Sequence, residues 1–432
     1  MQELIVDLHI HSHYSRATSK AADLKGLYYW GKLKGINIVG TGDFTHPEWF
    51  AELREFLESA EPGLLRLRPD IADEIDKALP ESVRGNTLRF IPTVEIATIY
   101  SKGGKVRKLH QLLVAPSLGT VSEINARLER IGNLKADGRP ILGLDSKELL
   151  RLTLEADANA LYIPAHVWTP WFGLLGSKSG FDTIQEAFEE LSSEVRAIET
   201  GLSSDPSMNW RVKNLDGLAI TSNSDAHSPG KLGREATVIR AELSYDGIIG
   251  AIKTNDKRLV GTIEFFPEEG KYHYDGHRAC DVRFTPEQTK AHGGVCPKCN
   301  KPLVVGVDYR VSELAELDRR VAFVPQNAKQ VEYIIPLPEI LAELHGTKSV
   351  TSVRVVHDLH RIYQTLGSEF EILRCLPVDQ IRQDFPLLAL AIERMRARQV
   401  VLEPGYDGVF GIIKVFKDLN ERQETLSQMS LL

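Results

Sequence analysis

The sequence is poor in cysteine and contains no long hydrophobic run. Four cysteines among 432 residues exclude the disulfide framework that holds many small secreted proteins together. No segment approaches the roughly 20 consecutive apolar residues that a membrane helix needs. The first residues, Met-Gln-Glu-Leu-Ile-Val-Asp, lack the basic and apolar regions of a signal peptide. These absences favour a cytoplasmic protein with no membrane partner.

Two common kinds of catalytic motif are also missing. There is no Gly-x-Ser-x-Gly turn, which leaves Ser/His/Asp catalysis as a weak alternative, and neither common glycine-rich nucleotide motif occurs. The net charge of −7 at pH 7 argues against a protein that coats nucleic acid through a general positive charge. The charge is uneven, however. Residues 271–310 hold seven Lys or Arg and four Asp or Glu, so a local basic patch can still meet phosphates.

Histidine is concentrated at the end of the first predicted strand, residues 5–10. His9 and His11 alternate along this apolar run, so their side chains point to the same face. His13 follows two residues later, where a polar turn begins. A single buried histidine is usually structural, but three imidazoles directed at one space are typical of a metal site.

Strand-like and helix-like stretches alternate over the first 264 residues. The predicted strands are residues 5–10, 36–41, 89–99, 110–115, 160–166, 197–200, 219–222 and 236–239. Predicted helices between them include residues 24–34, 120–131, 147–155 and 183–191. This alternation favours a parallel sheet. About seven or eight such units favour a closed α/β barrel over an open, doubly wound sheet.

Polar residues fall at or just beyond the ends of these predicted strands, where α/β barrels carry their catalytic groups. They are His9, His11, His13, Asp43, His46, Glu95, His166, Glu199, Asp225 and His227. Glu95 lies inside a β-branched run, and a buried carboxylate needs a cation or a metal nearby. These donors exceed the needs of one ion. The sequence therefore predicts two or three divalent ions bridged by Glu95. The donor types suit zinc, manganese or iron, with magnesium as an assisting ion.

A second metal motif follows the predicted barrel. His277 and Cys280 are separated by two residues, and so are Cys296 and Cys299. This spacing predicts one structural zinc held by three cysteines and one histidine. His273 and His292 compete with His277 for the histidine position. Cys375 stands alone, and we expect it in a hydrophobic core.

From residue 310 onward, helical periodicity dominates. Predicted helices are residues 331–344, 353–366, 378–383 and 387–399, followed by a strand at residues 412–416. The chain thus divides into a catalytic barrel (1–264), a zinc-binding module (265–310) and a mainly helical C-terminal domain (311–432).

The ordered polar residues resemble the polymerase-and-histidinol-phosphatase (PHP) superfamily. The resemblance rests on His9-x-His11-x-His13-Tyr14-Ser15, Glu95, His110, His166, Glu199 and Asp225-Ala226-His227. It implies a distorted (β/α)7 barrel that acts on phosphoesters. The implied ligands are His9, His11, Glu95 and Asp225 for one ion, Glu95, His110 and His166 for a second, and His13, His46 and His227 for a third. Asp225, His227, Glu199 and His13 are the implied catalytic residues.

One departure from the superfamily pattern concerns the turn after the second predicted strand. The usual Thr-Asp-His reads here Gly42-Asp43-Phe44, and the next histidine is His46. Whether Asp43 or His46 acts as the ligand there stays open.

The whole chain is similar to the endonuclease Q family. The similarity includes the order of barrel, zinc module and helical tail, the Ser15-Arg16-Ala17 turn and the loop from Ala165 to Trp171. It implies a metal-dependent DNA repair endonuclease that hydrolyses the phosphodiester 5′ to deaminated bases (uracil, hypoxanthine, xanthine) and to abasic sites. A sliding clamp or other repair proteins stay open as partners.

The loop after His166 carries three aromatic residues that suit an extruded base. Trp168, Trp171 and Phe172 follow this implied ligand directly, so they should overhang the metals and can stack on a base. Packing of a lid over the barrel mouth is the alternative for these residues.

Two further functions remain as alternatives. A phosphatase of a small ester, as in the histidinol-phosphate branch, is disfavoured because it needs neither the zinc module nor the C-terminal region. A non-catalytic DNA-binding module with a decayed barrel is disfavoured because nearly every ligand position is filled.

Overall fold

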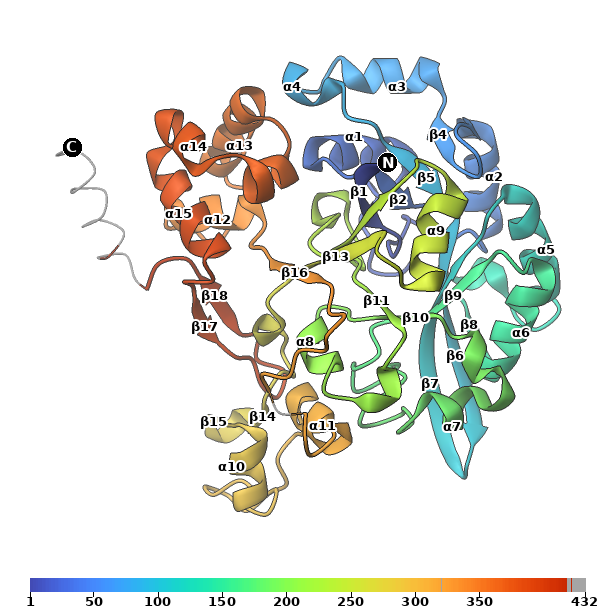
Figure 1. The fold of residues 1–432 in the computed structure, drawn as a ribbon, viewed down its shortest axis with the longest axis vertical. Helices are drawn as coiled ribbons and strands as arrows, with labels where there is room; N and C mark the ends of the chain where they lie inside the picture. Colours follow the sequence, from blue (N-terminus) through green and yellow to red (C-terminus); the bar gives the residue numbers. More distant parts are fainter. Residues whose placement is uncertain (320, 418–420, 422–432) are drawn as a thin grey trace.

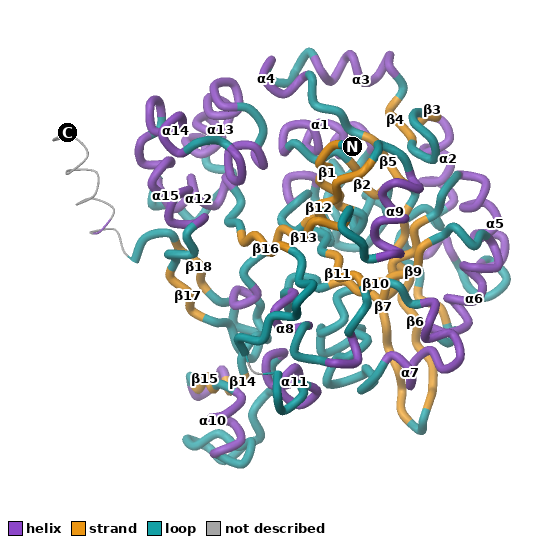
Figure 2. Tube along the Cα trace, viewed as in Figure 1, coloured by secondary structure: helices purple, strands orange, loops and turns teal. Residues whose placement is uncertain are grey.

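The computed structural model describes residues 1–319, 321–417 and 421 of the chain. Strands and helices alternate in the first 264 residues, whereas the C-terminal part is mainly helical, as Figure 2 shows by colour. None of the described helices combines the length and the apolar composition that crossing a membrane requires.

Seven strands form a closed ring, counting β5 (Arg89–Ile91) and β6 (Thr93–Lys102) as one interrupted strand. The ring order is β1 (Gln2–Asp7), β2 (Ile38–Gly40), β5–β6, β7 (Lys105–Val114), β9 (Leu161–Pro164), β10 (Ala197–Glu199) and β11 (Ala219–Thr221). Val167 N–H donates to the carbonyl of Glu199, which joins β9 to β10. His11 N–H donates to the carbonyl of Ala226, which closes the ring between β11 and β1. The predicted distorted seven-stranded barrel is confirmed.

The direction of two strands differs from the predicted parallel arrangement. β7 runs antiparallel to both β6 and β9, and β12 (Ala236–Ala241) runs antiparallel to β1. The physical reason for the first reversal is the turn between β6 and β7. It consists of Gly103 and Gly104, both with positive φ (61° and 71°). A two-residue glycine turn makes a hairpin, whereas a parallel connection needs a long crossover.

The barrel interior is filled by apolar side chains at the end opposite to the polar residues. Leu4, Val6 and Leu8 from β1 and its extension pack there with residues from the other ring strands. Helix α9 (Tyr245–Thr254) contributes Ile248 and Ile252 to this cluster, so it covers that end of the ring. The polar residues that follow the strands are thereby left at the other end, which is the arrangement that α/β barrels use for catalysis.

Helices and short strands surround the ring, and Figure 1 shows α5 and α6 on its outer side. Helix α1 matches the predicted range, and its ends are capped by Asp23 and by Gly35 in the left-handed conformation. The surrounding elements are α1 (Leu24–Lys34), α2 (Pro47–Phe56), β3 (Leu57–Ser59), β4 (Leu65–Leu67), α3 (Pro69–Asp76), α4 (Glu81–Arg84), α5 (Leu118–Leu128), η1 (Leu134–Ala136), β8 (Ile141–Leu142), α6 (Ser146–Ala156), α7 (Ile184–Phe188), η2 (Glu189–Glu194), α8 (Pro206–Asn209), η3 (Lys213–Leu215), η4 (Pro229–Lys231) and β13 (Leu259–Glu264).

A small module with little regular structure follows the barrel. It consists of η5 (Pro267–Glu269), β14 (Asp275–His277), η6 (Arg278–Cys280), β15 (Val282–Phe284) and α10 (Pro286–Ala291). Helix α11 (Val307–Leu314) then leads to β16 (Gln330–Tyr333), which pairs with β13 and extends the barrel sheet. The predicted helix 331–344 is therefore wrong over its first residues, because they form this strand.

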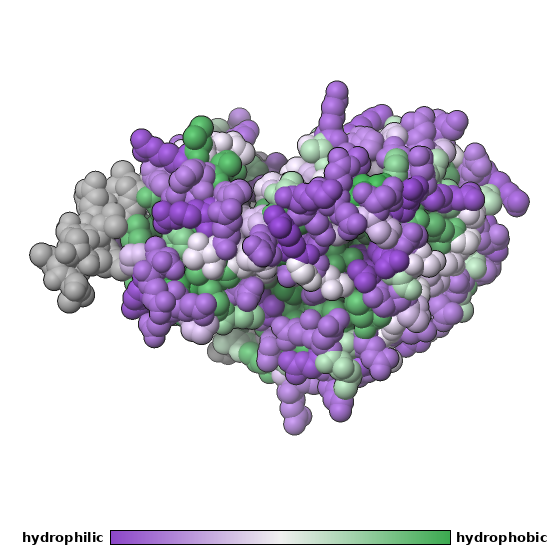
Figure 3. Space-filling view, turned by 90° about the horizontal axis from the view of Figure 1, so that it is seen from above, coloured by the Kyte–Doolittle hydropathy of each residue, from purple (hydrophilic) through white to green (hydrophobic). Residues whose placement is uncertain are grey.

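The C-terminal helices pack directly against the barrel. They are α12 (Leu337–Leu344), α13 (Val353–Leu366), the π-helix η7 (Glu371–Cys375), α14 (Val378–Asp384) and α15 (Pro386–Arg396), followed by the hairpin of β17 (Val401–Glu403) and β18 (Ile412–Lys414). The buried Lys34 of α1 lies 3.2 Å from Glu369, which also accepts a hydrogen bond from Tyr363. Figure 3 shows the C-terminal part and the barrel side by side from above, and one hydrophobic core runs through both.

Candidate metal centre

Four of the predicted ligands form one cluster at the open end of the ring, with three of them buried and Asp225 partly exposed. Each of His9, His11, Glu95 and Asp225 offers a donor atom within 4.8 Å of the others. His11 Nε2 lies 3.1 Å from Asp225 Oδ1 and 3.3 Å from Glu95 Oε2. His9 Nε2 lies 3.6 Å from Glu95 Oε1. Two imidazoles and two carboxylates fit a divalent transition-metal ion.

A second cluster shares Glu95 with the first. His110 Nδ1 lies 2.6 Å and His166 Nε2 lies 2.9 Å from Glu95 Oε1. The three residues again offer donors within 4.8 Å of one another. One carboxylate between two sets of imidazoles is the arrangement that bridges a pair of metal ions. This is the bridging position that the sequence predicts for Glu95.

An unpartnered atom in the first cluster indicates where a cation fits. Nδ1 of His9 lies 2.9 Å from Glu199, whereas Nε2 of His9 is buried and has no hydrogen-bond partner. A buried polar atom without a partner is costly, and an imidazole nitrogen with a free lone pair is the usual metal ligand. The residues therefore fit a metal ion.

Two buried carboxylates fix the orientation of the histidines. Glu199 faces Nδ1 of His9, and Asp43 faces Nδ1 of His11 at 3.1 Å. Such carboxylates behind metal-binding histidines determine the tautomer and the ring orientation. Glu199 also accepts hydrogen bonds from Asn223 and from the backbone of His166. Its contacts indicate a residue that positions ligands, in contrast to the direct catalytic role that the superfamily resemblance implies.

Neither Asp43 nor His46, the two candidates for the ligand after the second strand, belongs to a donor cluster of the described residues. Asp43 is buried and contacts His11, Ser12 and Ser15, so it supports the first cluster from behind. His46 stacks on Tyr14 with ring centroids 4.3 Å apart and belongs to neither cluster.

The structure does not gather the three histidines predicted for a third ion. His13 packs on Tyr14 and lies 3.9 Å from Glu52. His227 packs on His11 with ring centroids 4.5 Å apart. None of His13, His46 and His227 belongs to a group of close donors within the described residues, so no preformed third site exists there.

The backbone is strained at three residues of the centre. Asp43, His166 and Asp225 have φ angles of 49°, 28° and 47°, although none of them is glycine. Such conformations are uncommon for these residues, and they cluster at functional sites. Each follows the end of a strand, where the turn directs the side chain toward the cluster.

The sequence reasoning did not identify Arg139, which is the cation beside Glu95. Arg139 Nη1 lies 2.9 Å from Glu95 Oε2. Burial alone would raise the pKa of Glu95, but electrostatic interactions with the His110 and His9 rings and with the Arg139 guanidinium outweigh it and hold that pKa well below its usual range. Arg139 lies in a loop without a motif. The sequence pointed to it only indirectly, since a buried Glu95 needs a cation nearby.

The two histidines of the second cluster differ in pKa: at His166 burial is outweighed by the interaction with Glu95, which raises the pKa. Burial lowers the pKa of His110 to about 4, so its ring is neutral at pH 7. Metal binding requires a neutral imidazole, and the buried position of His110 provides one without competition from protons.

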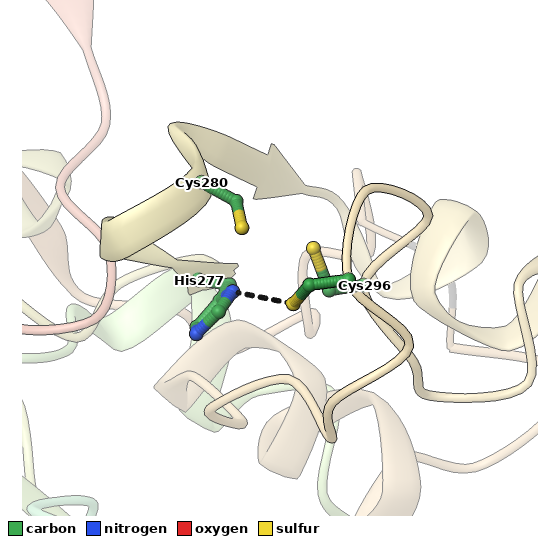
Figure 4. A group of neighbouring side chains, drawn as sticks. His277, Cys280 and Cys296 are labelled. Atoms are coloured by element: carbon green, nitrogen blue, oxygen red, sulfur yellow. Dashed lines mark hydrogen bonds between the residues drawn. The ribbon is translucent and has the colours of Figure 1, made fainter.

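The cysteine motif forms a third, separate cluster. His277, Cys280, Cys296 and Cys299 lie within 4.8 Å of one another through their donor atoms, and Figure 4 shows three of them facing a common space. Nδ1 of His277 lies 3.3 Å from Cys299 Sγ. Although burial opposes it, hydrogen bonds from the backbone of Lys298 and from His277 lower the pKa of Cys296 to about 6. A thiolate is the form that binds zinc.

The competing residues of this motif lie elsewhere. His273 and His292 are outside the cluster, and His292 donates to the carbonyl of Gln288. His277 is therefore the histidine of this site. Cys375 is exposed, so the expectation of a core position for it is wrong.

The aromatic loop divides into a buried and a surface part. Trp168 is fully buried, and its Nε1–H donates to Asn209 Oδ1 at 2.8 Å. The prediction that Trp168 binds substrate is wrong, because the ring belongs to the core. Phe172 packs on His110 with ring centroids 4.4 Å apart. Trp171 is 47% exposed.

Comparisons with known proteins agree with this site. Residues 210–256 match the PHP-associated family, and residues 336–399 match the MJ0043 C-terminal domain family. The uncharacterized protein MJ0043 of Methanocaldococcus jannaschii is 30% identical over 273 residues, which are 60% of this chain and 33% of MJ0043. This chain therefore spans about a third of that relative. The uncharacterized protein YqxK of Bacillus subtilis is 27% identical over 430 residues, 96% of this chain and all of YqxK.

Two solved structures are similar over nearly the whole chain. The lesion-specific endonuclease PfuEndoQ of Pyrococcus furiosus superposes with a TM-score of 0.82 and 28% identity, covering 98% of this chain and 99% of that one. An endonuclease Q in complex with a 27-mer duplex with an abasic lesion at the active site superposes with a TM-score of 0.81. It is 30% identical and covers 96% of this chain and 97% of that one.

Proposed function

This chain belongs to the endonuclease Q family, and on that premise we propose that it cleaves a DNA phosphodiester beside a damaged nucleotide. It is a hydrolase of the lesion-specific endonuclease type, with a PHP-type barrel as its catalytic part. The observation that carries the proposal is the pair of buried donor clusters joined by Glu95, within a fold that superposes on a relative whose active site holds a lesion in duplex DNA.

The two donor clusters support a pair of ions. In this proposal His9, His11, Glu95 and Asp225 would hold one ion, and Glu95, His110 and His166 would hold the other. Zinc, manganese and iron all suit these donors. Divalent ions supply charge stabilisation for a phosphate and a nucleophilic water at neutral pH.

The residues around the proposed ions orient the histidine ligands and bind the phosphate. Glu199 and Asp43 keep Nε2 of His9 and His11 directed inward. Arg139 is 30% exposed at its side chain, so its guanidinium can turn from Glu95 to a phosphate oxygen and bind it with two hydrogen bonds. His227 is a third exposed beside Asp225, and burial and the charge of His11 lower its pKa. A ring with a lowered pKa is neutral at pH 7 and can accept a proton, so His227 is our candidate for taking a proton from the attacking water.

The proposal also covers the lesions that are cut and the roles of the three parts of the chain. We assign abasic sites and the deaminated bases uracil, hypoxanthine and xanthine as substrates, with cleavage on the 5′ side. We assign residues 1–264 to the catalytic barrel, residues 265–310 to a module with a structural zinc, and residues 311–432 to a mainly helical C-terminal domain.

A cleavage assay with end-labelled duplexes tests the proposal. Matched duplexes with one uracil, one abasic site or no lesion are incubated with the protein and Mn²⁺, alongside p-nitrophenyl phosphate. We expect a single cut on the 5′ side of the lesion and none in the undamaged duplex. Asp225→Asn should abolish the cut. Hydrolysis of p-nitrophenyl phosphate without any cut in damaged DNA would instead support the small-ester phosphatase.

A further inference from the structure

Two aromatic side chains are unusually exposed. Among the described residues, Trp171 and Phe410 are the most exposed Trp and Phe, at 47% and 64%. The other Trp and Phe rings are at least half-buried. An exposed aromatic ring loses the stabilisation that burial provides, and clustered exposed apolar surface marks interaction sites. A ligand that covers both rings would explain their positions.

A series of contacts between sequence neighbours links these two rings to the metal centre. Phe172 packs on the metal-ligand candidate His110. The neighbouring Trp171 lies edge-to-face with Tyr272, at 6.4 Å between ring centroids. Beside Tyr272, Lys271 Nζ lies 5.1 Å from the ring centroid of Phe410. We call Phe172, Trp171, Tyr272 and Phe410 the aromatic strip.

Three different parts of the chain build the aromatic strip. Phe172 and Trp171 come from the loop after β9, Tyr272 precedes β14, and Phe410 comes from the turn between β17 and β18. Figure 1 shows the β17–β18 hairpin next to β14, and the backbone of Gly408 donates to the carbonyl of Lys271. Gly408 has a φ of 83°, and a Cβ there would meet the tips of Arg278 and Tyr272. The positive φ favours glycine at this position of the hairpin turn, which lies beside Tyr272.

Positive charge accompanies the rings, although the whole chain is acidic. Lys108 Nζ lies 5.9 Å from the ring of Phe172, Lys271 lies over Phe410, and the exposed Arg278 lies near Gly408. Three acids also lie nearby. The carboxylate of Asp407 accepts a hydrogen bond from the backbone of Arg278, and Asp281 and Glu403 line a pocket together with Phe410. Flat apolar faces with interleaved cations fit unpaired nucleotides, whose bases stack and whose phosphates attract Lys and Arg.

We propose that the aromatic strip binds unpaired nucleotides of the DNA strand whose phosphate lies at the metal centre. The bases stack on Trp171, Tyr272 and Phe410, and the phosphates meet Lys108, Lys271 and Arg278. Within a duplex the base faces are covered by their neighbours, so these rings can stack only where the helix is open. The strip continues from the second metal cluster to the β17–β18 hairpin. The DNA is therefore opened beside the cut over more than the damaged nucleotide. This inference rests on the proposed function.

Binding measurements test the strip without depending on cleavage. The affinities of a fluorescent, lesion-free single strand and of the matching duplex are measured for the wild type, Phe410→Ala, and Trp171→Ala combined with Phe410→Ala. We expect the single-strand affinity to fall roughly tenfold for each ring removed, with a much smaller change for the duplex. Phe410→Tyr keeps a ring and should bind as the wild type does. Ile141→Ala, which removes an equally exposed apolar side chain from β8, should change neither affinity.

Two outcomes would overturn the inference. One is an unchanged single-strand affinity in the double variant with a circular dichroism spectrum like that of the wild type. The other is an equal loss for single strand and duplex, which would show that the strip contacts only a paired helix. Cleavage of the abasic-site duplex by the wild type is measured separately. A protein that cuts the lesion but shows no strip effect retains the proposed function, whereas a protein that binds single strands through the strip but never cuts loses it.

Discussion

The carboxylate of Glu199 lies 2.9 Å from Nδ1 of His9. This contact determines which nitrogen of the His9 imidazole carries the proton. Because Nδ1–H donates to Glu199, the other nitrogen carries the lone pair, and that nitrogen is buried without a hydrogen-bond partner. The pair thus presents one preorganised ligand atom to the first metal cluster. Carboxylate, histidine and metal in series are the usual way in which proteins orient such ligands.

Glu199→Gln should weaken the first metal cluster while leaving the fold intact. The amide can no longer fix the tautomer of His9 by accepting a charge-assisted hydrogen bond, so we expect the metal affinity to fall by about 10- to 100-fold. Excess metal should restore cleavage. Metal titration together with the rate of cleavage checks this expectation.

Glu264→Gln is the matched control for that variant. Glu264 is equally buried, but it bonds to Ser222 and Thr200 and belongs to neither donor cluster. It should leave the metal affinity unchanged. If Glu199→Gln keeps its full metal content and still loses activity, Glu199 acts in the chemical step itself.

Removing two cysteines of the zinc module should cost the protein one metal ion and leave the barrel intact. In Cys296→Ser combined with Cys299→Ser, the cluster loses two of its four donors, so about one zinc per chain should be lost. DNA binding should fall, whereas the metal ions of the barrel stay. Elemental analysis and DNA affinity are the measurements. Cys375→Ser serves as the control, since Cys375 lies in no cluster. Full zinc retention in the double variant would contradict the assignment.

A buried carboxyl predicts how stability depends on pH. Burial raises the pKa of Glu264 from its ordinary value of 4.5 to about 8. Between these values the folded protein holds a proton that the unfolded chain releases, so stability falls as the pH rises from 4.5 to 8. Glu264→Gln is neutral at every pH and should remove part of this fall. Thermal unfolding at pH 5 and pH 8 measures it.

The outcome that contradicts this prediction is an equal loss of melting temperature between pH 5 and pH 8 in Glu264→Gln and in the wild type. The control is Glu55→Gln, which removes an exposed carboxyl from α2 and should follow the wild type at both pH values.

The residues of the two donor clusters were predictable from the sequence because their positions depend on local order. His9 and His11 alternate along one strand, and Glu95, His166 and Asp225 each lie in or directly after another strand. Strands that close into a barrel bring such residues together whatever the loops do. The two short gaps also sufficed to predict that His277, Cys280, Cys296 and Cys299 form one donor cluster.

The predictions that failed did so because contacts between distant segments decide those positions. Trp168 is buried because it meets Asn209, 41 residues away, and no periodicity in its own loop reveals this. The predicted third-ion histidines lie beyond the strand ends, where loop conformation decides, and Tyr14 separates His13 from His46. Arg139 reaches Glu95 from a loop with no motif. Gly103-Gly104 is a hairpin signal and predicts the reversed direction of β7. An argument from the alternation of strands and helices does not take such turns into account.

Arg139→Gln should separate phosphate binding from metal binding. Arg139 contacts the carboxylate that both donor clusters share, but it lies 30% exposed at the open end of the ring. In our proposal its guanidinium turns to the phosphate, so its loss should lower kcat/KM for an abasic-site duplex by about tenfold or more. The metal content should stay unchanged, because the six ligand residues remain. Arg151→Gln removes an arginine paired with Glu148 on α6 and should cut at the wild-type rate. Loss of metal and activity together in Arg139→Gln would mean that Arg139 only holds Glu95 in place, and the phosphate role would then pass to another cation.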